Sequence, residues 1–320
     1  MNKRDGRVDF LKALAIVMVV AIHTICVVDA DRGGWFWPVQ FLVNQFAHCA
    51  VPIFMMVTGA FSPKAVEEPV QFYRRRLGRL VVPTLLMSII YIGFRLLRHE
   101  SFATISRDSL HGMPYYHLWY AYMLIVLTLA LPFLAAFASR VPRWVVALTA
   151  LAVVLSPRWT GTDGWCAIIL GVGYALLGMA IYPWLRGRVS IKWALAAMTV
   201  ALSLTTWGGW LGLKSLGVGS MGYASPFVSG SSVCLFAAML LMPYKGELLF
   251  VSRLAKMTFG VYLVHPLVKF GPGLCRQLFP ANDGGVFAYA LFSFFVVLVG
   301  SAFLVEVSGR CRDWVQHLRT

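Results

Sequence analysis

Apolar runs of about 20 residues recur along the whole chain, separated by short polar segments. Within each run the apolar residues follow one another without the alternation of a membrane β-strand, so the pattern predicts helices and excludes a β-barrel. A helix needs about 20 apolar residues to cross the hydrocarbon core of a bilayer. The pattern therefore predicts an all-α, polytopic membrane protein.

We distinguish ten such runs and expect about ten transmembrane helices in one bundle. The run near 142–156 is the shortest of them. The runs take up most of the chain, so we expect residues 1–320 to form a single transmembrane domain with no appended soluble domain. The ten expected spans lie near 8–28, 39–60, 77–97, 117–137, 142–156, 165–184, 191–211, 226–243, 254–270 and 285–305.

Composition and charge narrow the class of protein further. Hydrophobic residues make up 59% of the chain and charged residues 13%, about half the charged share of a typical soluble domain, which excludes a cytosolic enzyme and a disordered protein. The net charge of +15 would suggest a nucleic-acid partner in a soluble protein. Here the basic residues gather at the ends of apolar runs, so we expect contact with lipid headgroups and no nucleic acid.

The basic residues also predict an orientation. Ten spans place both termini on one side of the membrane. If that side is the cytoplasm, most of the 28 Lys and Arg residues fall on the cytoplasmic side, as the positive-inside rule requires. We therefore expect both termini to be cytoplasmic.

The first run carries three ionisable residues, and such residues inside a span are costly enough to be functional candidates. Asp9 and Lys12 are three positions apart and therefore neighbours on a helix surface. They could simply neutralise each other near the inner interface. Lys12 and His23 are eleven positions apart, which puts them on one helix face, roughly 16 Å apart along the axis.

Three more histidines fall toward the outer half of other spans, namely His48, His117 and His265. With His23 they are expected to line one polar cavity, although each could also be an ordinary core histidine. Neutral imidazole can take a proton from a hydroxyl group near neutral pH, so acid–base chemistry fits this set. No His-x-x-x-His pair or nearby carboxylate cluster supports a metal, and we expect none.

A cluster of arginines, Arg74 to Arg76 with Arg79, comes at the inner end of the third expected span. Guanidinium groups bind phosphates through their planar fork of donors, so the cluster is a candidate phosphate site. The alternative is a basic loop that orients the span and contacts lipid headgroups.

The segment from Val51 to Gly59 contains a proline inside the second expected span. Pro52 frees a backbone carbonyl and can kink the helix, which would open room beside His48. The alternative is an ordinary kinked helix whose small residues allow close packing, a role that we also expect for Gly171, Gly173 and Gly178.

Five segments together resemble the membrane acyltransferase-3 family of bacterial integral-membrane acyltransferases, and most closely its stand-alone O-acetyltransferases of surface glycans. The family's first span pairs an arginine with a histidine, and here Lys12 replaces the arginine while the spacing to His23 is kept. The segments follow the family's order over nearly the whole chain: Val8-Asp9-Phe10-Leu11-Lys12 leading to His23, Val51-Pro52-Ile53-Phe54 through Thr58-Gly59, Arg76-Leu77-Gly78-Arg79 before Pro83, His117-Leu118-Trp119-Tyr120, and Gly260-Val261-Tyr262-Leu263-Val264-His265-Pro266.

The resemblance implies transfer of an acyl group, acetyl in most relatives, from cytoplasmic acyl-CoA to a hydroxyl group of a cell-surface or lipid-linked carbohydrate. It places the protein in the bacterial inner membrane as a multi-pass protein. From the resemblance and the residue pattern together we expect site residues of three kinds: His23, Asp9 and Lys12 for catalysis, Arg76, Arg79 and Arg75 for the donor, and His117, Trp119, His265 and His48 for the acceptor.

Two other classes remain open at this point. Ten spans with a prolyl kink and intramembrane polar residues also describe a transporter or flippase of a glycan or small solute. A non-catalytic membrane scaffold is the third possibility, and it would tolerate the loss of both His23 and Arg79.

Overall fold

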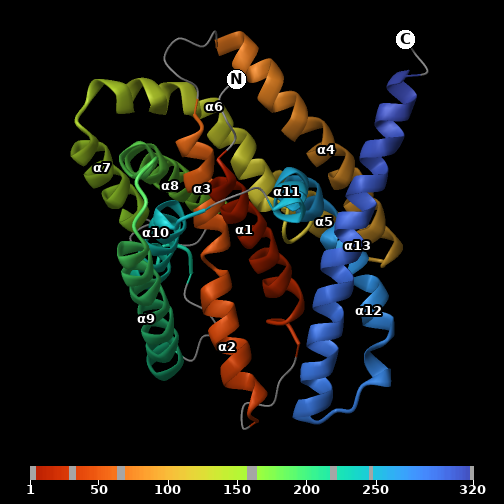
Figure 1. Cartoon of the computed structure of the whole chain (residues 1–320). Coiled ribbons are helices and arrows are strands. Elements are labelled where there is room, and N and C mark those ends of the chain that lie inside the picture. The colour runs from red at the N-terminus through yellow and green to blue at the C-terminus, as the bar shows by residue number, and fades with distance from the viewer. Residues whose placement is uncertain are drawn as a thin grey trace. The chain divides into compact units, whose positions relative to one another are not determined.

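The computed structural model describes residues 5–28, 34–62, 69–156, 164–216, 222–244 and 248–317, and these residues form helices and turns without a β-strand (Figure 1). The expected all-α class is thereby confirmed. The chain divides into two compact units, Met1–Ala50 with Arg188–Thr320 and Val51–Gly187. Each unit is described by itself.

The first unit is built around α1, which packs along α11 and also contacts α2, α10 and α13. Helix α9 packs against α10 and α2, and α12 against α13. Phe36, Val286 and Ala290 form a small buried core between α2 and α13. The elements are α1 (Gly6–Thr24), α2 (Phe36–Ala47), α9 (Ile191–Leu216), α10 (Pro226–Leu241), α11 (Leu249–Val268), α12 (Phe270–Leu274), the 3₁₀ helix η2 (Arg276–Leu278) and α13 (Asp283–His317).

Side chains satisfy the backbone groups at both ends of α1. At the start, the Asp5 carboxylate accepts a hydrogen bond from the backbone N–H of Arg7, as an N-cap should. At the other end, the amide nitrogen of Gln40 donates to the carbonyl oxygens of Ile25 at 2.7 Å and Val28 at 2.6 Å. These carbonyls follow the last helical turn and would otherwise lack a partner in an apolar setting. The C-terminal end of α1 is therefore fixed to α2.

In the second unit, α8 packs against α7 and α6, α6 packs against α4, and α4 contacts α5. Helices α3 and α8 approach so closely that a Cβ on Gly59 would meet the carbonyl of Ala175, and one on Gly178 would meet the carbonyl of Met56. The expected packing role of the small residues is thus confirmed at these positions. The elements are α3 (Ala50–Ala60), α4 (Pro69–Leu97), α5 (Phe102–Leu110), α6 (Trp119–Arg140), α7 (Arg143–Leu155) and α8 (Gly164–Leu185).

Six helical segments among the described residues are long and apolar enough to cross a membrane. Helix α7 has 13 residues and extends only about 20 Å, less than the roughly 30 Å of hydrocarbon. The protein is therefore a multi-pass membrane protein, whereas the number of ten spans and the orientation stay predictions. The six segments are Phe36–Ala60, Val70–Leu97, Trp119–Arg140, Ala167–Leu185, Ile191–Leu211 and Asp283–Gly309.

Two boundaries differ from the sequence-based expectation in ways that matter for the site. The span expected at 39–60 consists of α2 and α3, which are separated by the non-helical residues His48 and Cys49. Pro52 has no N–H to donate to the carbonyl of His48, so the helical ladder is interrupted there. The span expected to begin at residue 77 begins at Pro69, which places the arginine cluster on a helix instead of in a loop.

Candidate active site

The imidazole rings of His23 and His265 stack on each other in the first unit. Their centroids lie 5.2 Å apart, and the ring planes are inclined by 27°. His23 belongs to the last turn of α1 and His265 to the last turn of α11, and these two helices pack along each other. Two imidazoles from different helices therefore meet in an apolar interior, where a group that can gain or lose a proton is otherwise rare.

Pro266 determines how the ring of His265 is held. A proline inside a helix has no N–H, so the carbonyl of Tyr262, four residues earlier, receives no helical hydrogen bond from it. The Nδ1 atom of His265 lies 2.7 Å from that carbonyl oxygen and 3.3 Å from the carbonyl oxygen of Val261. Because a carbonyl only accepts, Nδ1 carries the proton and donates it. In the neutral ring the lone pair therefore lies on Nε2.

His48 is held in the same way beside a tyrosine. Its Nδ1 lies 2.7 Å from the carbonyl oxygen of Asn44, so its lone pair also lies on Nε2. The ring of Tyr223 lies 5.3 Å from that of His48. Burial raises the pKa of Tyr223 to about 12, so its phenol stays protonated and able to donate a hydrogen bond at neutral pH.

Two residues near these histidines were not expected from the sequence. Lys269 follows His265 by one helical turn and lies within electrostatic range of both His23 and His265. Its spacing of four from His265 is a signal that could have revealed it, because such residues share a helix face. Tyr223 lies in a short turn before α10, where no periodic pattern marks it.

Asp9 and Lys12 lie at the other end of α1 from His23. Asp9 is almost completely buried, and the hydroxyl of Ser252 on α11 donates to its Oδ2 at 3.2 Å. Since α1 is one unbroken helix, Lys12 and His23 are roughly 16 Å apart along its axis. The structure therefore does not bring Asp9 or Lys12 to the histidine pair, and Asp9 joins α1 to α11 instead.

The arginine cluster occupies the first turns of α4 in the second unit. Arg74, Arg75 and Arg79, with Gln71 and Gly78, line an open hollow of about 530 Å³ on this helix. Gln71, Arg75 and Arg79 follow one another at intervals of four residues, and Gln71, Arg74 and Gly78 at intervals of three and four, which places each set along one helix face. The three guanidinium groups therefore offer an exposed basic surface that suits a phosphorylated ligand.

Arg76 lies apart from this hollow and does something else. Its guanidinium donates to the carbonyl oxygen of Phe61, next to the end of α3, at 2.5 Å and lies 5.1 Å from the ring centre of Phe72. The carbonyl near the end of α3 and the aromatic face of Phe72 both stabilise the cation, so these contacts serve the fold. The structure therefore separates Arg76 from Arg75 and Arg79, with which the sequence grouped it.

His117 is buried in the second unit among tyrosines. Its ring meets Tyr91 edge-on at 5.0 Å and Tyr115 at 5.7 Å, while Tyr91 and Tyr115 stack on each other at 4.4 Å. Trp119 is the first residue of α6, two positions further on, and is half-buried. An imidazole and several aromatic rings thus gather just before α6.

The expected histidine set is divided between the two units. His23, His48 and His265 belong to the first unit, and His117 belongs to the second. One cavity lined by all four histidines therefore stays a prediction. In the part of the chain that the structure describes, no three His, Cys, Asp or Glu side chains are grouped so as to hold a metal ion.

Long apolar helices carrying buried histidines and an exposed arginine cluster define a multi-pass membrane protein equipped for chemistry on a substrate. The family model described as an acyltransferase domain matches residues 5–306. The chain belongs to this family, the acyltransferase-3 family, and is a membrane-bound acyltransferase that uses an acyl donor. No curated protein and no solved structure gives a significant match.

Proposed function

We propose that the protein transfers an acyl group, in the simplest case acetyl, from cytoplasmic acyl-CoA to a hydroxyl group of a cell-surface or lipid-linked carbohydrate. We place it in the bacterial inner membrane, with residues 1–320 acting as one transmembrane domain. The observation that carries the proposal is the stacked pair of His23 and His265. An acyltransferase must deprotonate a hydroxyl group, and a neutral imidazole is the side chain suited to this at physiological pH.

The two histidines of the pair have different roles in the reaction. His23 takes the proton from the acceptor hydroxyl, whose oxygen attacks the thioester carbonyl. The C–S bond then breaks, and the CoA thiolate leaves and takes up that proton. His265 cannot donate from Nε2 while it is neutral, because its proton is engaged on Nδ1 with Tyr262. Nε2 of His265 can therefore only accept a hydrogen bond, and the acceptor hydroxyl is the donor that suits it.

The hollow on α4 suits the phosphates of the donor. Arg74, Arg75 and Arg79 line it together, and CoA carries a diphosphate and a 3′-phosphate that guanidinium groups bind with paired hydrogen bonds. Arg76 supports the hollow indirectly, by joining α4 to the end of α3 through Phe61. We therefore assign donor binding to Arg75 and Arg79, with Arg74 in place of Arg76.

The acceptor is assigned to the aromatic residues around His117. Tyr116 is 47% exposed and lies 5.4 Å from the ring of His117, and Trp119 follows on α6. Aromatic rings with a polar edge bind amphipathic faces such as those of sugars. His48, with Tyr223 beside it, supplies a further imidazole to the same reaction.

The first experiment measures CoA release by the protein in lipid nanodiscs supplied with acetyl-CoA and a glycan acceptor. We expect His23→Ala to lower the rate by about 10²–10⁴-fold, the usual cost of removing a general base. His111→Ala is the matched control, because His111 is exposed and the one hydrogen bond described for its ring goes to the carbonyl of Arg107 in the preceding helix. Near-normal activity of His23→Ala would contradict the proposal, as would movement of an unmodified solute without CoA release.

The second experiment measures the KM for acetyl-CoA. Arg79→Ala and Arg75→Ala should each raise it about tenfold, because one charge-assisted hydrogen bond is worth about that factor. Arg143→Ala, an exposed arginine at the start of α7, is the control and should leave the KM unchanged. If all three variants behave alike, the phosphates do not bind at α4.

A further inference from the structure

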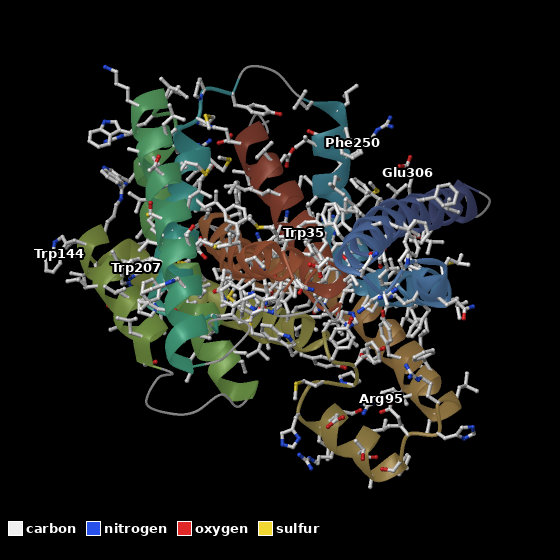
Figure 2. The ribbon with its side chains drawn as sticks, turned by 90° about the horizontal axis from the view of Figure 1, so that it is seen from below. Trp35, Arg95, Trp144, Trp207, Phe250 and Glu306 are labelled. Atoms are coloured by element: carbon white, nitrogen blue, oxygen red, sulfur yellow. The ribbon has the colours of Figure 1, made fainter. Side chains whose placement is uncertain are left out.

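One buried arginine joins three segments at the end of α4. Arg95, labelled in Figure 2, is 7% exposed. Its guanidinium donates to the Glu100 carboxylate at 2.7 Å, the Asp108 carboxylate at 2.7 Å and the carbonyl oxygen of Pro114 at 3.1 Å. These acceptors lie in the linker after α4, in α5, and in the segment that leads to α6. Arg95 therefore fixes all three to one another.

The segment after α5 is also held by backbone hydrogen bonds to the end of that helix. Helix α5 ends at Leu110, and the chain reverses at Gly112, whose φ of +72° suits glycine. The backbone N–H of Met113 then donates to the carbonyl oxygen of Asp108 at 2.8 Å. Asp108 thus binds this segment with its backbone and Arg95 with its side chain, so the arginine adds to the hydrogen bonds by which the end of α5 holds the segment.

The same face of α4 also receives the aromatic residues that follow. Tyr91 precedes Arg95 by one helical turn, and the ring of Tyr115 stacks on it at 4.4 Å with the planes inclined by 9°. His117 meets the edge of the same tyrosine at 5.0 Å. Arg95 therefore fixes the backbone just before the segment Tyr115–His117, and Tyr91 fixes the rings of Tyr115 and His117 within it.

A role in stability alone explains this arginine poorly. Moving a guanidinium out of water is costly, and the Glu100 and Asp108 side chains stay 38% and 33% exposed, so solvent weakens both ion pairs. A well-packed apolar residue often stabilises a protein as much as such a pair does. The last turn of α4 lies in an apolar span, where a leucine would fit the surroundings. What an apolar residue cannot supply is a directed hydrogen bond to the Pro114 carbonyl.

We propose that Arg95 is a positioning residue for the acceptor: through Glu100, Asp108 and Pro114 it holds Tyr115, Tyr116 and His117 in the geometry that receives the carbohydrate. This inference rests on the proposed function. Arg95 does not touch the acceptor itself. It acts by keeping Tyr116 exposed and His117 buried against Tyr91 while the sugar binds.

The test compares the KM values for acceptor and donor. Arg95→Leu alone would leave two carboxylates without their cation, so the main variant is the triple substitution Arg95→Leu, Glu100→Gln and Asp108→Asn, which removes all three charges. We expect this variant to reach the membrane at the wild-type level, with an acceptor KM raised at least about tenfold and an unchanged donor KM. Arg95→Lys, which keeps the charge but loses the fork, should lie between the wild type and the triple variant.

Arg98→Ala is the matched control. Arg98 lies on the same helix end but is exposed and stacks over Phe94 at 5.7 Å. It should leave both KM values unchanged. As a second measurement, hydrogen exchange of the backbone at 111–118 should become faster in the triple variant and stay the same in Arg98→Ala.

An acceptor KM within twofold of the wild type in the triple variant, or unchanged exchange at 111–118, would overturn the inference. So would a parallel loss of protein level and kcat with both KM values unmoved, because that pattern marks a purely structural role. A wild-type protein that releases no CoA with any glycan would instead overturn the proposed function, and with it the acceptor role of Arg95.

Discussion

Prolines control the histidines of this protein through the hydrogen bonds that they cannot make. Pro266 leaves the Tyr262 carbonyl available, and His265 takes it with Nδ1. Pro52 leaves the carbonyl of His48 without its helical donor, and the helix stops there. The sequence shows both prolines, but the consequence for each imidazole follows only from knowing which atom lies beside the freed carbonyl.

Replacing Pro266 should therefore disturb the chemistry without removing a reacting group. Pro266→Ala restores an N–H that competes with His265 for the Tyr262 carbonyl, so the proton is no longer confined to Nδ1. We expect CoA release to fall about 10–100-fold, as it does when a partner that fixes a histidine is lost. Pro83→Ala, the proline inside α4, is the control for restoring a helical N–H elsewhere. Equal activity of the two variants would show that the tautomer is irrelevant.

His99 tests a different property of single residues, the strain of the backbone. It lies in the turn after α4 with a φ of +59°, a conformation that costs a residue with a side chain about 1 kcal/mol. His99→Gly should therefore raise the free energy of unfolding by up to about 1 kcal/mol, which thermal unfolding in detergent would detect as a higher Tm. His99→Ala keeps the strain and should show no gain. A gain of the same size in both variants would rule out this explanation.

At the scale of the element, the start of α4 determines what the arginines can do. An expected start at residue 77 leaves Arg74 to Arg76 in a loop, where their directions are undefined. The helix begins at Pro69 instead, and the side chains have defined contacts: Arg74, Arg75 and Arg79 line the hollow, whereas Arg76 donates to the Phe61 carbonyl. Hydropathy could not predict this, because the polar first turns of α4 lie outside the apolar run.

The contact between α3 and α8 gives a prediction for a whole pair of helices. Gly178→Val would drive a branched side chain into the Met56 carbonyl, so the helices would have to separate. We expect a loss of about 1–3 kcal/mol in the free energy of unfolding, the usual cost of overpacking. Gly93→Ala is the control, because a Cβ there meets nothing within 4 Å and alanine favours a helix. If both variants keep the wild-type Tm, the helices are not in this close contact.

For the whole molecule, the sequence predicts the all-α class and the multi-pass character because both follow from the length of the apolar runs. It predicts the histidine and arginine candidates because ionisable residues in such runs are rare. Some neighbours of those residues come from segments far along the chain. Tyr223, in the turn before α10, lies beside His48, and no local pattern marks this pair. The bond between Arg95 and Asp108 in the next helix is likewise not marked by the sequence. The division into two units is also beyond a hydropathy pattern.

The predicted orientation can be tested on the complete protein in cells. With the six native cysteines replaced by alanine or serine, a single cysteine at His111 should react with a membrane-impermeant maleimide added outside. A single cysteine at Gly187, which follows α8 and has a φ of +81° typical of an exposed turn, should react only after permeabilisation. The reverse pattern would place both termini outside and would contradict the positive-inside assignment.

The two hydrogen bonds donated by Gln40 limit which substitutions this position can accept during evolution. Its amide serves two backbone oxygens of the neighbouring helix end, Ile25 and Val28. A substitution to leucine would raise the hydropathy of the segment and so make it better suited to the hydrocarbon core of a membrane. It would nevertheless leave these two carbonyl oxygens without a hydrogen-bond donor and destabilise the end of α1, where His23 lies. Natural drift toward a more lipophilic sequence should therefore be blocked at this position, even though no reactant touches it.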